Sequence, residues 1–241
     1  EAFTAYAVQE ALAHFNTARE VARRMQATGE SVDGELLNRL YRARGQALEL
    51  NQDDEAAQAN YEEMQAEAVQ RQSQTLELAA LIAQCNLHGH YTGVFNPLKA
   101  KESGQAALTL ARELGDRATE AAALWGIASA ELYSAGDSKQ VMAYGQPALG
   151  LARELGLKEL VGRILTDLCW PFVAQKQLDK ARETLCEAQA IWRELGNLPR
   201  LAEASRFMLR LHFLSGEHAR LLAEAPALRE LGVSIGSRQD Q

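Results

Sequence analysis

One tetrapeptide recurs through the second half of the chain and restricts the available folds more than any other feature. Arg-Glu-Leu-Gly stands at residues 112–115, 153–156, 193–196 and 229–232, at separations of 41, 40 and 36 residues. The composition of the chain predicts roughly 0.02 occurrences of this tetrapeptide by chance. Recurrence at a nearly constant period indicates a protein built from a duplicated structural unit.

Each copy of the tetrapeptide is predicted to end a helix, because glycine adopts the left-handed backbone conformation without steric cost. The residue after the glycine, Asp116 in the first copy and Asn197 in the third, is of a type that caps the start of a helix. A second break lies inside each interval, at Gly136-Asp137, Lys176-Gln177 and Gly216-Glu217. We therefore expect a repeated hairpin of two antiparallel helices, each of roughly 16–18 residues.

The composition favours the same fold. Alanine and leucine supply 42 and 35 of the 241 residues, whereas valine and isoleucine together supply 14. Alanine and leucine lead the ranking of helix propensity, and β-branched residues prefer strands, so an all-β fold is excluded. Because no run of 18 apolar residues occurs, the sequence predicts a soluble chain without a membrane span.

The charged and nucleophilic residues form no catalytic or metal-binding pattern. A net charge of −7 and a pI near 5.4 argue against a nucleic-acid partner. Cys85, Cys169 and Cys186 match neither a disulfide framework nor a zinc site, and we interpret them as small core residues of a cytoplasmic protein. His88 and His90 flank a glycine and are interpreted as helix-end or surface histidines. We therefore predict no enzymatic activity, no cofactor and no bound metal.

The residues within the units resemble those of the tetratricopeptide repeat (TPR) family. In that family, the first helix of a unit carries a bulky residue followed by a small one. A Gly-Asp turn then leads to a second helix with small residues. Here Trp125, Ser129, Gly136-Asp137, Val141 and Ala148 follow this pattern. The period of about 40 residues exceeds the family's usual 34. In this respect the chain is similar to the long repeats of bacterial regulators of the maltose-activator type and of arrays joined to ATPases or nucleotide cyclases.

The resemblance implies an all-α fold, a right-handed superhelix of about 11 helices that form five antiparallel hairpins after a lone N-terminal helix. Residues 1–241 are predicted to form one domain, with an insertion at 84–97. An incomplete repeat at 1–28 is followed by complete repeats at 33–70, 71–115, 117–156, 157–196 and 197–232, and by a fraying tail at 233–241. Because the chain begins within a repeat, we expect it to be part of a longer protein.

The resemblance also implies that the first helix of each hairpin lines a concave groove. The side chains expected there are cationic, polar and aromatic: Arg39, Arg42, Gln46, Tyr133, Arg163, Thr166, Trp170, Arg206, Arg210 and Phe213. Arginines interleaved with aromatic rings bind carboxylates by bidentate hydrogen bonds and stacking, which favours an acidic peptide as ligand. In a competing interpretation, the arginines pair with neighbouring glutamates and Trp170 packs beside Pro171.

Three functions are compatible with this fold. The first is a non-catalytic scaffold that binds a protein or peptide within a larger bacterial signalling or transcription-regulator protein. The second is an effector-sensing domain that binds a small molecule in the groove and changes the curvature of the array. The third is homo-oligomerisation, as in a homodimer, because the lone first helix around Phe15 leaves an apolar face without a partner helix.

Overall fold

A computed structural model of the chain describes residues 2–134 and 136–236, with the backbone alone at residues 2–6. The predicted all-α fold is confirmed, since the described part of the chain holds eleven helices and no strand. Their bounds are α1 (Ala2–Ala27), α2 (Gly34–Leu50), α3 (Asp54–Arg71), α4 (Gln74–Gly89), α5 (Pro97–Leu114), α6 (Arg117–Tyr133), α7 (Ser138–Glu154), α8 (Lys158–Ala174), α9 (Leu178–Glu194), α10 (Leu198–Leu214) and α11 (His218–Ile235). Within the described ranges, none of these helices is both long and apolar enough to span a membrane.

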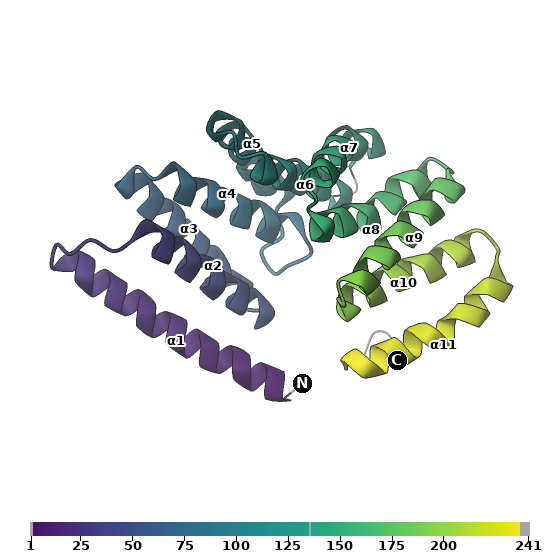
Figure 1. The fold of residues 1–241 in the computed structure, drawn as a ribbon, viewed down its shortest axis with the longest axis horizontal. Helices are drawn as coiled ribbons and strands as arrows, with labels where there is room; N and C mark the ends of the chain where they lie inside the picture. The colour runs from purple at the N-terminus through teal and green to yellow at the C-terminus, as the bar shows by residue number, and fades with distance from the viewer. Residues whose placement is uncertain (1, 135, 237–241) are drawn as a thin grey trace. The chain divides into compact units, whose positions relative to one another are not determined.

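The helices group into two compact units. The N-terminal unit, Glu1–Ser134, contains α1 to α6, and the C-terminal unit, Ala135–Gln241, contains α7 to α11. Inside each unit, every helix packs against the next one along the chain (Figure 1). The first helices of neighbouring hairpins also touch, α4 with α2 and α6 in one unit and α8 with α10 in the other. This is the packing of TPR-type hairpins.

The division between the units falls between the two helices of the predicted repeat 117–156. The assignment of residues 1–241 to one domain stays a prediction. The part of the predicted tail at 237–241 lies outside the described residues.

The predicted turns are confirmed at three of the four repeated tetrapeptides. The backbone φ is 69°, 68° and 64° at their glycines, Gly115, Gly156 and Gly196. The Asp116 side chain accepts a hydrogen bond from the backbone N–H of Thr119 at 2.9 Å, and Asn197 caps α10 in the same way. The glycine therefore ends one helix and the polar residue after it starts the next.

The fourth tetrapeptide does not end a helix, so that prediction and the boundary at residue 232 are wrong. Gly232 is buried inside α11, which continues to Ile235 and ends at Gly236 with a φ of 70°. The last interval is four residues shorter than the one before it. Because α11 keeps the length of the other helices, Gly232 arrives one turn before its end.

Small residues set the spacing between helices. Six alanines of the helices are fully buried: Ala57, Ala100, Ala107, Ala148, Ala181 and Ala188. Gly45 of α2 shows how closely the helices approach, because a Cβ atom there would lie 2.3 Å from the ring of Tyr61 on α3. At such positions a single methyl group does not fit without displacing the neighbouring side chain.

Gly45→Ala is expected to lower the free energy of unfolding by about 1–3 kcal/mol, because the added methyl group overpacks the contact with Tyr61. Gly150→Ala in α7 is the matched control, since nothing lies within 4 Å of its Cβ position. The control is expected to raise the free energy of unfolding by up to about 1 kcal/mol through helix propensity. Urea unfolding followed by circular dichroism measures both, and equal effects would contradict the close approach.

A polar cluster joins the last three helices. Arg182 of α9 donates two hydrogen bonds to the Glu217 carboxylate, at 2.6 and 2.8 Å. The buried ring of His212 lies between two carboxylates, with Nδ1 2.9 Å from Glu217 and Nε2 3.3 Å from Glu224. The hydrogen bonds from Arg182 lower the pKa of Glu217 from 4.5 to about 2, helped by His212 and Arg220.

This pKa shift makes the contribution of Glu217 depend on pH. A carboxyl group whose pKa is depressed by folding stabilises the protein above its unfolded pKa of about 4.5, and loses this effect as the pH falls through about 2. Arg182→Gln is therefore expected to be less stable than the wild type at neutral pH, with a difference that shrinks below about pH 4.5. Urea unfolding at successive pH values checks this, and a difference independent of pH would contradict it.

Candidate functional site

The C-terminal unit brings several predicted site residues onto one surface, which we call the α8–α10 face. It consists of Arg163, Asp167 and Trp170 on α8 and of Arg200, Glu203, Arg206, Phe207 and Arg210 on α10. Spacings of three and four residues place the members of each set on one side of their helix. The face carries four arginines and two carboxylates, so it has a net positive charge on a chain that is acidic overall.

An aromatic contact holds one end of this face. The rings of Trp170 and Phe207 meet edge to face, with centroids 5.1 Å apart. The guanidinium carbon of Arg210 lies 4.7 Å from the centroid of the Trp170 ring, within the range of a cation–π interaction. Arg210 is exposed, and the structure gives it no ion pair within residues 136–236. The stacking orients its N–H groups without using up their hydrogen-bonding capacity.

Arg163 occupies the other end of the face. Burial lowers the pKa of its guanidinium, and the neighbouring Arg200 lowers it further, whereas Asp167, Glu159 and Glu203 raise it. Arg200 donates a hydrogen bond to Glu203 at 2.8 Å. For Arg163 itself, no carboxylate of the described C-terminal unit lies within ion-pair distance. A desolvated cation without a direct counter-ion gains from binding an anion.

Of the arginines predicted to line the groove, Arg163 and Arg210 form no glutamate pair with a described residue of the C-terminal unit, so the competing interpretation is not confirmed for them. Arg200 pairs with Glu203, but Arg210 stacks on Trp170, and Trp170 packs against Phe207. Arg163 and Arg210 lie at the two ends of the face.

Thr166 was predicted to line the groove, and this prediction is wrong. Its side chain is buried, and its hydroxyl donates to the carbonyl of Gly162 at 2.8 Å. The same oxygen accepts a hydrogen bond from the Trp192 indole at 3.2 Å. Thr166 therefore turns toward α9, because a hydroxyl at this position satisfies a buried indole N–H.

The other predicted residues lie elsewhere. Arg39, Arg42 and Gln46 are exposed along α2 of the N-terminal unit. Tyr133 ends α6, where its ring lies 5.2 Å from that of Tyr91 in the loop between α4 and α5. Phe213 is 61% exposed near the end of α10 and meets the His218 ring at 6.1 Å. These residues contribute nothing to the contacts at the centre of the α8–α10 face.

Four members of the face were not predicted: Asp167, Arg200, Glu203 and Phe207. Phe207 lies three residues before Arg210, so an aromatic residue at helical spacing was a usable signal. Nothing in the sequence places Arg200 beside Arg163, because their proximity depends on how α8 and α10 pack.

Two of the three cysteines are core residues as predicted. Cys85 and Cys169 are buried, and burial raises the pKa of the Cys85 thiol to about 12. Cys186 is exposed on α9, so its assignment to the core is wrong. His88 and His90 lie at the end of α4, as predicted. His88 is in the last turn of the helix, and His90 directly follows it.

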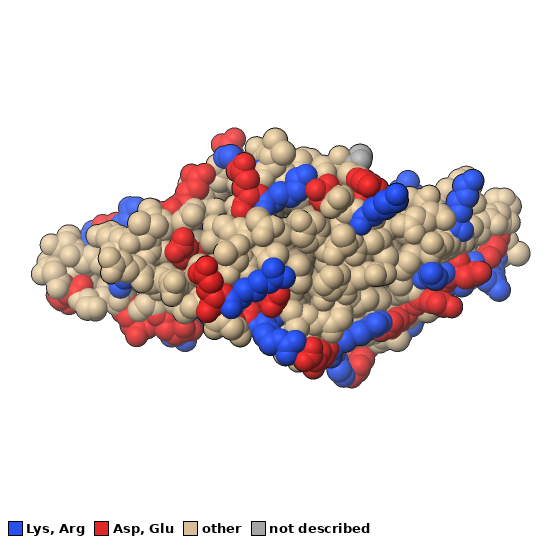
Figure 2. Space-filling view, turned by 90° about the horizontal axis from the view of Figure 1, so that it is seen from above, with Lys and Arg blue, Asp and Glu red and all other residues tan. Residues whose placement is uncertain are grey.

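Charges of both signs are mixed on the surface. On the face drawn in Figure 2, lysine and arginine side chains alternate with aspartate and glutamate and are separated by uncharged residues. Among the described residues, no three His, Cys, Asp or Glu side chains are grouped so that they could hold a metal ion.

No family model and no curated protein sequence matches the chain. Solved structures do match its fold. A signal transduction ATPase with numerous domains from Pyrococcus horikoshii, which has a tetratricopeptide repeat sensor, aligns over 94% of this chain and 34% of its own, with 16% identity and a TM-score of 0.67. Aspartyl phosphate phosphatase F from Bacillus subtilis covers 92% of this chain and 56% of its own, with 14% identity and a TM-score of 0.71.

A Rap protein in complex with competence and sporulation factor is similar over 94% of this chain and 65% of its own. Its identity is 12% and its TM-score 0.73. The chain thus spans between a third and two thirds of the length of these three proteins. At such low identity the likeness concerns the fold, which is a helical repeat of the TPR type.

Proposed function

We propose that this TPR-type chain is a non-catalytic binding module whose α8–α10 face holds an acidic peptide segment of a partner protein. The observation that carries the proposal is the state of Arg163, a largely buried cation with no ion pair in the described C-terminal unit. Carboxylates bind arginine through paired, charge-assisted hydrogen bonds. In this proposal the module serves regulation or assembly within a larger protein.

The geometry of the face sets the form of the peptide. Arg163 and Trp170 are seven residues apart on α8, which corresponds to about 10 Å along a helix. A peptide in the polyproline II conformation covers that distance in about three residues, and its residues three apart lie on the same side. A segment with two acidic residues separated by two others would place one carboxylate at Arg163 and the other at Arg210. An apolar side chain between them would lie against the Trp170 ring.

Two structural neighbours support a binding role for this helical repeat. One structural neighbour has a tetratricopeptide repeat sensor, and another is in complex with competence and sporulation factor. The effector-sensing and homo-oligomerisation alternatives stay predictions. The peptide proposal differs from them because it requires a carboxylate-bearing ligand and no second copy of the chain.

The test is a fluorescence anisotropy titration with a labelled peptide of the form Glu-Leu-Ala-Glu, flanked by uncharged residues. Peptides in which both glutamates are glutamine or lysine serve as controls with the same length. We expect binding of the acidic peptide alone, and weaker binding at higher salt because the contacts are ionic. Equal binding of the glutamine and glutamate peptides would reject the proposal.

A further inference from the structure

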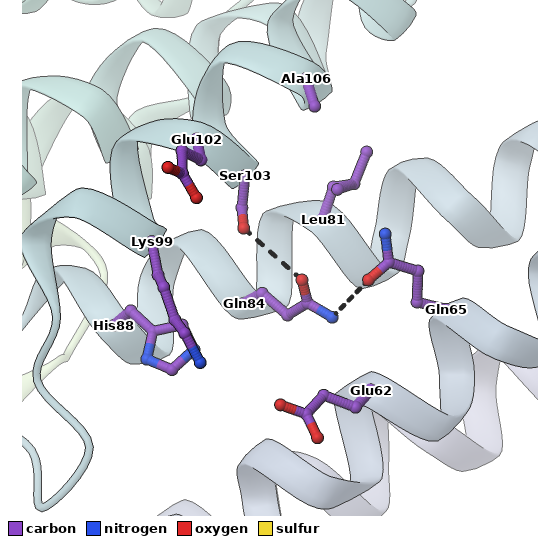
Figure 3. Close-up of a pocket in the computed structure, with 9 residues that line it drawn as sticks. All are labelled: Glu62, Gln65, Leu81, Gln84, His88, Lys99, Glu102, Ser103 and Ala106. Carbon is purple, nitrogen blue, oxygen red and sulfur yellow. Dashed lines mark hydrogen bonds between the residues drawn. The ribbon is translucent and has the colours of Figure 1, made fainter.

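A polar cavity of about 370 Å³ lies within the N-terminal unit, between α3, α4 and α5. Figure 3 shows its lining, with the side chains of α4 in the middle and those of α3 and α5 on either side. It belongs to the N-terminal unit and shares no residue with the α8–α10 face. Its volume is at the lower end of the range for small-molecule sites.

The floor of the cavity is held in place by hydrogen bonds. Gln84 of α4 is 8% exposed, and its Nε2 donates to Gln65 Oε1 at 2.9 Å and to the Tyr61 carbonyl at 3.3 Å. Its Oε1 accepts a hydrogen bond from the Ser103 hydroxyl of α5 at 3.5 Å. All three helices are thus joined beneath the cavity, so its shape exists without a ligand.

His88 presents an unused acceptor to this cavity. The side chain is 4% exposed, and its Nδ1 lies 2.8 Å from the carbonyl oxygen of Val94. A carbonyl only accepts, so Nδ1 carries the proton of the neutral ring and Nε2 keeps a lone pair. His88 lines the cavity, and no hydrogen-bond donor among the described residues contacts its Nε2 atom. This acceptor is therefore available to a donor group of a ligand in the cavity.

The rim adds charges of both signs. Glu62 of α3 and Glu102 of α5 lie on opposite sides of the α4 side chains, and Lys99 of α5 lines the same cavity (Figure 3). Glu62 accepts a hydrogen bond from Gln58 at 2.7 Å. Lys99 forms no ion pair with a described residue of the N-terminal unit. Two carboxylates, one ammonium group and an imidazole acceptor therefore line one small pocket that is open to solvent.

We propose that this cavity binds a small zwitterion of the α-amino-acid class. An ammonium group donates N–H groups, and the acceptors that line the cavity for it are Glu62, Glu102 and His88 Nε2. The carboxylate of the same ligand pairs with Lys99. The amides of Gln65 and Gln84 and the hydroxyl of Ser103 are left to contact a polar side chain of the ligand. Neither a pure cation nor a pure anion satisfies all these groups.

The test starts with the twenty L-amino acids, each added singly to the full chain and measured by thermal shift and then by isothermal titration calorimetry. We expect at least one to bind, with a polar side chain favoured. The matching decarboxylated amine and deaminated acid, which keep the same side chain, are expected to bind on the order of tenfold to a hundredfold more weakly.

Variants of the exposed rim locate the site without disturbing the fold. Glu62→Gln and Lys99→Gln are each expected to weaken binding of the best amino acid on the order of tenfold to a hundredfold. Glu113→Gln on α5 and Lys139→Gln on α7 are exposed controls outside the cavity, and are expected to leave the affinity unchanged.

The proposal is overturned if none of the twenty amino acids binds, if the amine alone binds as tightly as the amino acid, or if the rim variants bind like the wild type. None of these results bears on the acidic-peptide titration, because that titration depends on residues of the C-terminal unit. The two proposals therefore stand or fail separately.

Discussion

Trp192→Ala is expected to lower the free energy of unfolding by about 3–5 kcal/mol, because it removes a large, fully buried side chain and leaves a cavity. The indole lies over Gly162, where a Cβ atom would be 2.8 Å from the ring. Its N–H donates to Thr166, whose hydroxyl in turn donates to the Gly162 carbonyl. The substitution thus removes both the packing and the hydrogen bond that join α8 to α9.

Urea unfolding followed by circular dichroism measures this loss. Trp170→Ala is the comparison, since Trp170 is partly exposed and its removal is expected to cost less. Gly162→Ala changes the α8 side of the same contact. It is expected to lower the free energy of unfolding by about 1–3 kcal/mol, because the added methyl group overpacks the contact with Trp192. A Trp192→Ala protein as stable as Trp170→Ala would contradict the packing described for α8 and α9.

The double substitution Arg163→Gln with Arg210→Gln is expected to weaken binding of the acidic peptide by roughly a hundredfold or more. Each arginine is assigned one carboxylate, and a hydrogen bond to a charged group contributes about 1.5–3 kcal/mol. Glutamine keeps a polar side chain but lacks the charge and the paired N–H donors of arginine. The loss of affinity therefore measures the contribution of that charge and of the paired hydrogen bonds. Fluorescence anisotropy with the glutamate peptide provides the measurement.

The matched control is Arg193→Gln with Arg229→Gln. Both arginines are exposed on α9 and α11, outside the α8–α10 face, so the net charge changes equally. The control is expected to bind within about twofold of the wild type, since distant exposed charges are screened by salt. If both double variants lost affinity equally, the peptide would be responding to overall charge and the assigned face would be wrong.

The helices of the fold could be predicted because their signals are local. A glycine followed by a capping residue, as at Gly115 and Asp116, sets a helix end through the backbone of a few neighbouring residues. The same motif gave a wrong helix end at Gly232, because the shortened last unit places this glycine inside α11. The helix ends one turn later, at Gly236 with a φ of 70°.

The candidate site was only partly predictable. Arg163, Trp170 and Arg210 were predicted from the resemblance to the TPR family, whose inward-facing positions lie on one side of each first helix. Thr166 has a compatible position, but the indole of Trp192 provides a buried partner that the sequence does not reveal. The cavity between α3, α4 and α5 was not foreseen at all. It depends on the direction of His88, which is set by the loop carbonyl of Val94.

The most direct test of the proposed peptide-binding face uses the three tryptophans as reporters in one experiment. Trp125 and Trp192 are buried in the two units, whereas Trp170 lies partly exposed on the α8–α10 face. In a ¹⁵N-labelled sample, the indole N–H signal of Trp170 is expected to move as the acidic peptide is added, while those of Trp125 and Trp192 stay in place. Saturable peptide binding with no movement of the Trp170 signal would contradict the account.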